Sequence, residues 1–285
     1  MRGKLAVSDS RLELVAALAL PNLDVETKVR MPFRPGKLAS GSMLYVADAD
    51  GPLVHALHPK QLSEHKCFAT GPEIEALALS ESGMHLYVLS GGANSLQMVD
   101  VGQGRLINVA RTGMRPRGFA LDTSGKYIAV ACGDTYDILL LEAATLRTLS
   151  TFQAGGVTIA VRFFAGQLMA LCATGEYDMG TLVGAVGSNG KWCPWAALPG
   201  MPGAIAPCGG GLLVGHHVCL TMLDPPNGRI RWQTKISGLP TEIIPIGRIA
   251  CYADGLDGMI GLIDLRKGTV LRRLRVEEPV GLCEV

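Results

Sequence analysis

The stretch Thr112-Gly-Met-Arg-Pro-Arg-Gly-Phe-Ala-Leu-Asp-Thr-Ser-Gly-Lys-Tyr-Ile-Ala-Val-Ala131 holds a Pro, a short apolar segment, a turn and a second apolar segment. The turn, Asp122 to Gly125, is built from residues that favour tight turns, and the second segment is rich in β-formers. Two further apolar segments, 138–141 and 146–152, follow it. Four short strands in roughly forty residues is the period of a propeller blade.

The same phrase returns along the whole chain. It consists of a Pro, two variable residues, an apolar residue, and a small or apolar residue four positions after the Pro. Its anchors are Pro35, Pro72, Pro116, Pro202, Pro240 and Pro279, with Gly156 in place of a Pro. A seventh interval of similar length is completed only by joining the C-terminus to the N-terminus. A period that closes across the termini predicts a ring.

We therefore predict an all-β fold, a single seven-bladed β-propeller of residues 1–285 with four antiparallel strands per blade. The segment 280–285 supplies the inner strand of the closing blade, and 4–8, 13–20 and 25–31 supply the other three. A blade that shares N- and C-terminal strands closes the ring and leaves no exposed sheet edge. The predicted blades are 280–285 with 1–34, 35–71, 72–115, 116–155, 156–201, 202–239 and 240–279.

Two stretches resemble a known repeat. The phrase from Thr112 to Ala131, and Ser80-Glu-Ser-Gly-Met-His-Leu-Tyr-Val88 before it, are similar to the YVTN-type β-propeller repeat. In that family a G-x-x-P phrase, an S-x-x-G turn, an L-Y-V strand and a V-I-D strand recur in each blade. Asp48 and Asp134 stand where the family often has Asn. The resemblance implies a seven-bladed propeller, often a binding scaffold, and implies no reaction.

Composition excludes several classes of partner. A net charge of +1 and a pI near 7.6 give no field that would attract nucleic acid. No apolar run approaches the roughly 18 residues that a membrane span needs, and the longest, 14–20, lacks the flanks of a signal peptide. Eight cysteines without C-x-x-C or zinc-like spacing favour buried free thiols in a reducing compartment. We expect a cytoplasmic protein with no nucleic-acid partner.

The loops after the second strand of each blade carry polar residues, and in a propeller these loops share the face at one mouth of the central channel. Carboxylates gathered there suit a cation, an amine or a sugar, although Asp also occurs in such turns because it bonds nearby backbone groups. The candidate ligand-binding residues in these loops are Asp48, Asp134, Tyr136, Asp137, Glu176, Tyr177, Asp178, His216 and Asp254.

The residues just after each Pro anchor lie at the same mouth, closer to the axis. They add Lys37, Arg117 and Glu242 to the candidate ligand-binding residues. Mixed charges at this depth suit a channel entrance that holds water or a small polar ligand, and Arg115, Arg117 and Arg162 together could meet an anion. Charges on a solvated propeller surface are the alternative interpretation.

Signals for metal or cofactor chemistry are weak. His216 and His217 are adjacent, and adjacent residues on a strand point to opposite faces. The six histidines form no H-x-H or H-E-x-x-H array, and the turn-then-Trp phrase at 228–232, typical of quinoprotein propellers, occurs once. No nucleophile elbow, P-loop or Rossmann fingerprint is present. We expect no metal site, no cofactor and no catalytic residue.

The sequence favours a non-catalytic scaffold that binds a protein partner or a small polar ligand at the channel-mouth face. Two alternatives stay open. One is a propeller hydrolase or lyase, lactonase-like, that uses acidic residues at the mouth such as Asp134 and Glu176. The other is a sensor of cations or small molecules at the same mouth. The oligomeric state is left open.

Overall fold

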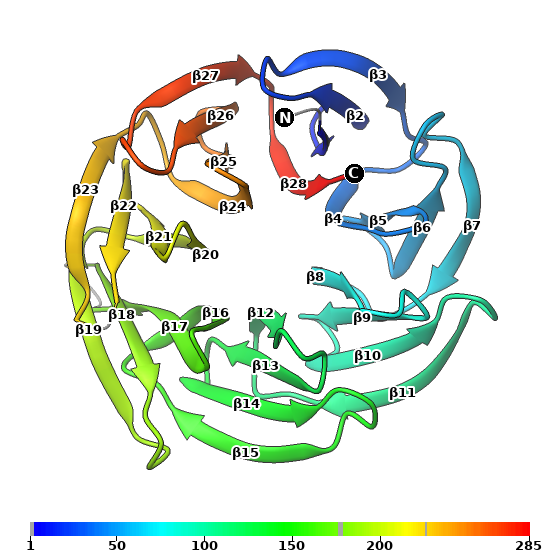
Figure 1. Ribbon diagram of the computed structural model, residues 1–285. Coiled ribbons are helices and arrows are strands. Elements are labelled where there is room, and N and C mark those ends of the chain that lie inside the picture. Colours follow the sequence, from blue (N-terminus) through cyan, green and yellow to red (C-terminus); the bar gives the residue numbers. More distant parts are fainter. Residues whose placement is uncertain (1–2, 176–178, 226) are drawn as a thin grey trace.

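The computed structural model describes residues 3–175, 179–225 and 227–285. These residues form 28 β-strands in seven four-stranded antiparallel sheets around one axis (Figure 1). The predicted all-β, seven-bladed architecture is confirmed. Within the described ranges, no helix is long and apolar enough to cross a membrane.

In each blade the strands are arranged in order from the axis outward. The closing blade contains β28 (Pro279–Glu284), β1 (Lys4–Asp9), β2 (Leu14–Ala19) and β3 (Asp24–Arg30). The second blade contains β4 (Pro35–Ser40), β5 (Leu44–Asp48), β6 (Leu53–Leu57) and β7 (Glu64–Ala69). The third contains β8 (Ile74–Leu79), β9 (His85–Ser90), β10 (Ser95–Asp100) and β11 (Arg105–Arg111).

The remaining four blades follow the same order. The fourth contains β12 (Pro116–Leu121), β13 (Tyr127–Cys132), β14 (Asp137–Glu142) and β15 (Thr148–Gln153). The fifth contains β16 (Val157–Phe164), β17 (Gln167–Thr174), β18 (Gly180–Val186) and β19 (Trp192–Pro199). The sixth contains β20 (Pro202–Cys208), β21 (Gly211–His216), β22 (Cys219–Asp224) and β23 (Arg229–Lys235). The seventh contains β24 (Pro240–Ile246), β25 (Ile249–Asp254), β26 (Met259–Asp264) and β27 (Val270–Arg275).

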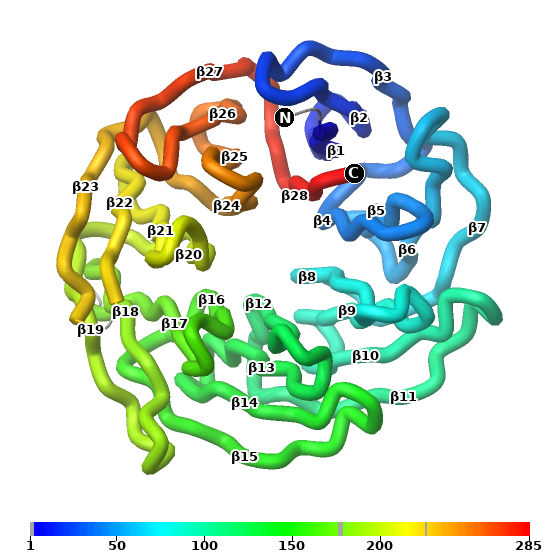
Figure 2. Tube along the Cα trace, viewed as in Figure 1, coloured from blue at the N-terminus to red at the C-terminus, as the bar shows by residue number. Residues whose placement is uncertain are grey.

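Both termini contribute to one sheet, as predicted. The C-terminal strand β28 pairs antiparallel with the N-terminal strand β1, with Cys283 opposite Ala6 and Leu282 opposite Val7. Figure 2 shows the red C-terminal segment running beside the blue N-terminal segment on the inner side of the ring. The strand β28 therefore lies at the axis, between the inner strands β24 and β4 (Figure 1).

The core lies between the faces of neighbouring blades. The second strand of a blade is covered on both sides, so it is apolar almost throughout, as in β21, where all six residues are buried. Between the third and fourth blades, Leu89 and Leu96 pack with Ile128 and Val130 in one cluster. Outermost strands such as β15 are mostly exposed. A strand buried on both faces reads as a continuous apolar run, which explains the run at 127–132.

A bulge interrupts the inner strand near its start. In β12, Pro116 pairs with Cys132 and Gly118 pairs with Ala131, which leaves Arg117 as the extra residue. The same shift occurs in the other inner strands. In β8 and β16 the residues before the bulge are Ile74 and Thr158. In the other five inner strands the Pro anchor is itself the residue before the bulge. The anchors at 72 and 156 instead lie two residues before that position.

Side chains inside a blade pack closely around Gly261, on the third strand of the seventh blade. Gly261 of β26 pairs with Tyr252 of β25, and a Cβ at Gly261 would overlap the buried Tyr252 ring. Because overpacking forces a side chain out of its rotamer, we expect Gly261→Ala to cost about 1–3 kcal/mol of the free energy of unfolding. Thermal unfolding checks this, with Gly255→Ala as control, where the nearest atom lies 3.7 Å from the new Cβ. Equal Tm values for the two variants would contradict it.

Candidate functional site at the mouth of the channel

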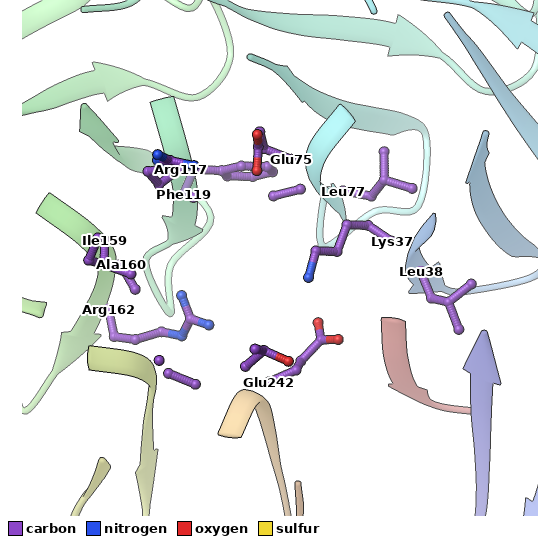
Figure 3. Close-up of a pocket in the computed structure, with 15 residues that line it drawn as sticks. Lys37, Leu38, Glu75, Leu77, Arg117, Phe119, Ile159, Ala160, Arg162 and Glu242 are labelled. Atoms are coloured by element: carbon purple, nitrogen blue, oxygen red, sulfur yellow. The ribbon is translucent and has the colours of Figure 1, made fainter. Parts of the chain in front are cut away.

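A cavity of about 310 Å³ opens at the start of the inner strands, where six of them converge. Hydrophobic and small residues form part of its wall, among them Leu38, Leu77, Phe119 and Ala160. Charged side chains come from five different blades, which Figure 3 shows around the pocket. They are Lys37 of β4, Glu75 of β8, Arg117 of β12, Arg162 of β16 and Glu242 of β24.

The bulge explains why charged residues reach this cavity. A β-bulge re-aims the side chain of its extra residue and is common beside active sites. Glu75 and Arg117 are the extra residues in β8 and β12, and Lys37 lies in the wider bulge of β4. Glu242 directly follows the bulge of β24. One backbone feature, repeated in each inner strand, thus directs side chains from separate blades into one space.

Arg162 carries a charge at a position deeper in the channel, where the matching residues of other blades are small. It lies two positions after Ala160, the first paired residue past the bulge of β16. The matching positions of β12 and β20 hold Ala120 and Ala206. Burial lowers the pKa of Arg162 and the charge of Glu242 opposes this shift, but an Arg guanidinium stays protonated in proteins. One blade therefore places a fixed positive charge where others have a methyl group.

The closing strand β28 holds two of the charged side chains. The Nζ of Lys37 donates a hydrogen bond to the carbonyl of Val280 at 3.0 Å. The backbone N–H of Leu282 donates to Oε2 of Glu242 at 2.9 Å. Burial raises the pKa of Glu242, while Lys37, this N–H and Arg162 act to lower it. Figure 3 shows Lys37, Arg162 and Glu242 pointing toward one another from three sides of the pocket.

Glu75 and Arg117 form the other charged part of the cavity. Burial raises the pKa of Glu75, and the nearby charges of Arg117 and Lys37 oppose that shift. The buried Nε of Arg117 has no hydrogen-bond partner among the described residues. A buried donor without a partner costs free energy, so this Nε–H is available to a bound molecule.

Of the residues that the sequence proposed as ligand-binding, Lys37, Arg117 and Glu242 line the cavity. Several others stabilise turns instead. Asp48 accepts a hydrogen bond from the N–H of Asp50 at 3.0 Å, and Asp254, fully buried, accepts from the N–H groups of Leu256 and Asp257. Burial raises the pKa of Asp254. These contacts are the backbone-bonding role that Asp commonly has in turns.

The other candidates in the described loops also lie outside the cavity. Asp137 accepts a hydrogen bond from the Thr135 hydroxyl at 2.8 Å. Asp134 lies 3.8 Å from Arg115 in an exposed ion pair, so Arg115 does not join Arg117 and Arg162. Tyr136 lines a separate cavity of about 280 Å³. Glu176, Tyr177 and Asp178 lie outside the described residues.

His216 is a buried structural residue. Only 1% of it is exposed, its Nδ1 lies 2.9 Å from the carbonyl of Pro199, and its Nε2 lies 2.8 Å from the Thr221 hydroxyl. Burial lowers the pKa of His216 and keeps the ring neutral. Among the residues that the structure describes, no group of three or more His, Cys, Asp or Glu side chains is placed to hold a metal ion.

Two lining residues were anticipated from the sequence only in part. Arg162 was expected with Arg115 and Arg117 as a possible anion site, and Glu75 was one of the residues 73–75 expected at the mouth without being singled out. Glu75 follows Ile74 as Arg117 follows Pro116, but the Pro at 72 suggested another register. Arg162 likewise falls on the position of Ala120 only once the bulge of β16 is known. The signal for both residues was the bulge register, which depends on pairing with the second strand.

This arrangement suits hydrolytic chemistry at a carbonyl carbon. A carboxylate with a raised pKa is a suitable general base near neutral pH. Positive side chains beside it can stabilise the negative charge that develops on an attacked carbonyl oxygen. The cavity combines both kinds of group within partly apolar walls.

Comparisons with known proteins add a family match and a set of similar folds. Residues 48–158 match the model of the family described as "Lactonase, 7-bladed beta-propeller", a region that includes Glu75 and Arg117. The search of curated proteins found no match.

Similar solved structures come from functionally diverse proteins. The periplasmic gluconolactonase of Pseudomonas aeruginosa is 18% identical, with a TM-score of 0.76 over 100% of this chain and 99% of that one. A Lactobacillus plantarum protein is 14% identical, with a TM-score of 0.80 over all of both chains. Kuenenia stuttgartiensis hydrazine synthase is 15% identical, with a TM-score of 0.76 over 89% of this chain and 90% of that one. At these identities the likeness concerns the fold alone.

The function that the sequence favoured needs correction. A non-catalytic scaffold disagrees with the match of the lactonase family model to residues 48–158. The hydrolase alternative fits that match better. The sequence missed this because a propeller repeat is recognised from turns and apolar strands, whereas the charged residues of the cavity vary from blade to blade.

Proposed function

We propose that the protein hydrolyses lactones in the cavity at the mouth of its channel. The observation that carries the proposal is the match of the lactonase family model to residues 48–158, since this region supplies Glu75 and Arg117 to the cavity. The chemistry of the lining supports it independently, because buried carboxylates and cations from different blades meet there.

In this proposal Glu242 is the general base. Its carboxylate takes a proton from a water molecule as the water oxygen attacks the lactone carbonyl carbon. Arg162 and Lys37 stabilise the oxyanion that forms on the carbonyl oxygen. When the ring C–O bond breaks, the protonated Glu242 returns its proton to the leaving alkoxide, and a hydroxy acid is released. The hydrogen bond from Leu282 to Glu242 keeps one carboxylate oxygen in place during both proton transfers.

A polyhydroxylated lactone, such as that of a sugar acid, suits the other half of the cavity. Glu75 can accept hydrogen bonds from hydroxyl groups, and Arg117 can donate through its buried Nε–H. The gluconolactonase among the similar structures supports the same substrate class, as an analogy between folds. The volume of about 310 Å³ lies at the small end of the range for ligand pockets.

The test is turnover of lactones by the purified protein. We expect acid release from δ-gluconolactone, and from its 6-phosphorylated form, to exceed the uncatalysed rate in a pH-stat titration. A linear ester of similar size serves as control and should react more slowly, because its flexible chain must be ordered on binding. An acid-release rate equal to that of buffer for every lactone in the panel would refute the proposal.

A further inference from the structure

A second cavity lies on the opposite face of the propeller, between the sixth and seventh blades. Its volume is about 550 Å³, larger than that of the channel mouth. It is bounded by turns between first and second strands, at Gly209 and Gly247, and by the turn from Asp264 to Lys267 that follows β26. These turns connect strands at the end away from the Pro anchors, so this cavity is separate from the proposed lactone site.

The lining of this cavity is strongly basic. Four of the eight lining residues are cationic and one is acidic; the cations are Arg231, Arg248, Arg266 and Lys267. Arg231 is already paired, since its Nε donates to Asp224 at 2.6 Å and its Nη1 donates to the carbonyl of Gly209 at 3.3 Å. Among the described residues, Arg248, Arg266 and Lys267 make no ion pair.

The acidic residue of the lining does not neutralise these charges by direct pairing. The Oδ1 of Asp264 accepts hydrogen bonds from the backbone N–H groups of Arg266 and Lys267, at 2.9 and 2.8 Å. The pKa of Asp264 is lowered, first by the N–H of Lys267, and the positive charges of Lys267 and Arg266 act in the same direction. Asp264 therefore shapes the turn, and its oxygen faces the backbone.

The walls of the cavity are tied together across the two blades. The indole Nε1 of Trp232, on the outer strand β23 of the sixth blade, donates to the carbonyl of Leu265 at 3.0 Å. Within the seventh blade, the N–H of Leu265 donates to the carbonyl of Arg248 at 3.0 Å. These bonds fix the backbone from which Arg248 and Arg266 project.

The fold does not require cations at these positions. The bond from Leu265 to Arg248 recurs in the fourth blade, from Ala143 to Lys126, and in the third, from Val101 to Met84. The two residues after the donor are Arg266 and Lys267 in the seventh blade. The corresponding residues are Ala144 and Thr145 in the fourth blade, and Gly102 and Gln103 in the third. The same turn thus forms with one cation or none.

We propose that this cavity binds a small molecule that carries phosphate groups, held by Arg248, Arg266 and Lys267 between the sixth and seventh blades. Arg guanidinium groups match phosphate oxygens with paired hydrogen bonds. The volume is typical of a small-molecule site. A nucleic acid would need an extended basic surface, whereas the equivalent turns of the third and fourth blades have no cation at the positions of Arg266 and Lys267. This site is independent of the proposed hydrolysis, and its test measures binding alone.

The test is titration calorimetry of the full chain with pyrophosphate at low ionic strength. We expect one pyrophosphate per chain, weaker binding of inorganic phosphate, and no saturable heat with chloride. Arg248→Ala/Arg266→Ala should weaken binding by about tenfold or more, since each charge-assisted hydrogen bond contributes well over 1 kcal/mol. Because both side chains are on exposed turns, the double variant should keep the Tm of the parent.

Two further variants control the assignment. Lys126→Ala/Arg147→Ala removes two cations from the matching region of the fourth blade and should change the Kd by less than about twofold. Arg162→Met, in the channel cavity, should leave pyrophosphate binding intact. The proposal is overturned if pyrophosphate does not bind, if the control pair or Arg162→Met weakens binding as much as Arg248→Ala/Arg266→Ala, or if a short single-stranded oligonucleotide binds more tightly than pyrophosphate.

Discussion

Replacing Glu242 with Gln is expected to lower kcat/KM for lactone hydrolysis by at least ~100-fold, because a neutral amide cannot accept the proton of the attacking water. The amide oxygen can still accept the hydrogen bond that Leu282 donates to Glu242, so the local structure should be kept. Steady-state assays of the two proteins with the same lactone measure this change. A Glu242→Gln protein with parental kcat/KM would remove Glu242 from the mechanism.

The pH profile gives the same prediction a second readout. Burial raises the pKa of Glu242 above its ordinary value, so kcat/KM should fall as the pH decreases through a pKa higher than that of a free Glu side chain. The Glu242→Gln protein should lack this acidic limb. Asp134→Asn is the matched comparison, since Asp134 lies on the mouth face but outside the cavity, and it should keep both the rate and the profile.

The substitution Glu242→Gln, which lowers activity, is not expected to lower stability. A carboxyl group whose pKa is raised on folding loses its proton more readily in the unfolded chain, so the folded state is disfavoured as the pH rises above the unfolded pKa. This unfavourable contribution grows as the pH rises from the unfolded pKa towards the raised folded pKa of Glu242, and Gln removes it. We expect the Tm of Glu242→Gln at pH 7 to equal or exceed that of the parent. A large fall in Tm would mean that lost activity reflects lost structure.

Deletion of residues 280–285 is expected to unfold the ring or to lower the free energy of unfolding by at least ~5 kcal/mol. The deleted segment carries almost all of β28, including Leu282 and Cys283, which are 2% and 8% exposed. Removing them exposes the cores on both sides of the closing blade, and each large buried side chain alone is worth about 2–5 kcal/mol. The loss also leaves β1 without its inner partner. Thermal or urea unfolding measures it.

Deletion of Val285 alone is the control for the truncation. Its backbone N–H donates to the carbonyl of Lys4 at 2.9 Å, but it lies outside β28 and is 37% exposed. We expect a loss of less than about 1 kcal/mol, the contribution of one hydrogen bond. If the protein without residues 280–285 melts like the full chain, ring closure by β28 does not hold the fold together.

The deletion also bears on the site, because Lys37 and Glu242 both bond to the backbone of β28. These two residues lie far apart in the sequence, on strands that flank β28 at the axis (Figure 1). The C-terminal strand therefore fixes the two charged groups relative to each other while it completes the sheet of the closing blade. Ring closure and site geometry depend on the same six residues.

The sequence by itself determined the ring. Turn residues such as Asp122 and Gly125, and apolar strands such as 127–131, are local signals, and their period fixed the number of blades and the shared closing blade. The same local chemistry explains why Asp48 and Asp254 stood out as candidates: an Asp in a turn bonds its own backbone, whatever ligand the protein binds.

Only the tertiary structure decided which side chains face the channel. A shift of one residue in the pairing of a strand moves every side chain to the opposite face, and the bulges of β8 and β16 place Glu75 and Arg162 in the cavity. The positions of those bulges follow from pairing with the second strand, not from the residues near the Pro anchor. The contact of Glu242 with Leu282 likewise exists only because the ring brings residues 40 positions apart together.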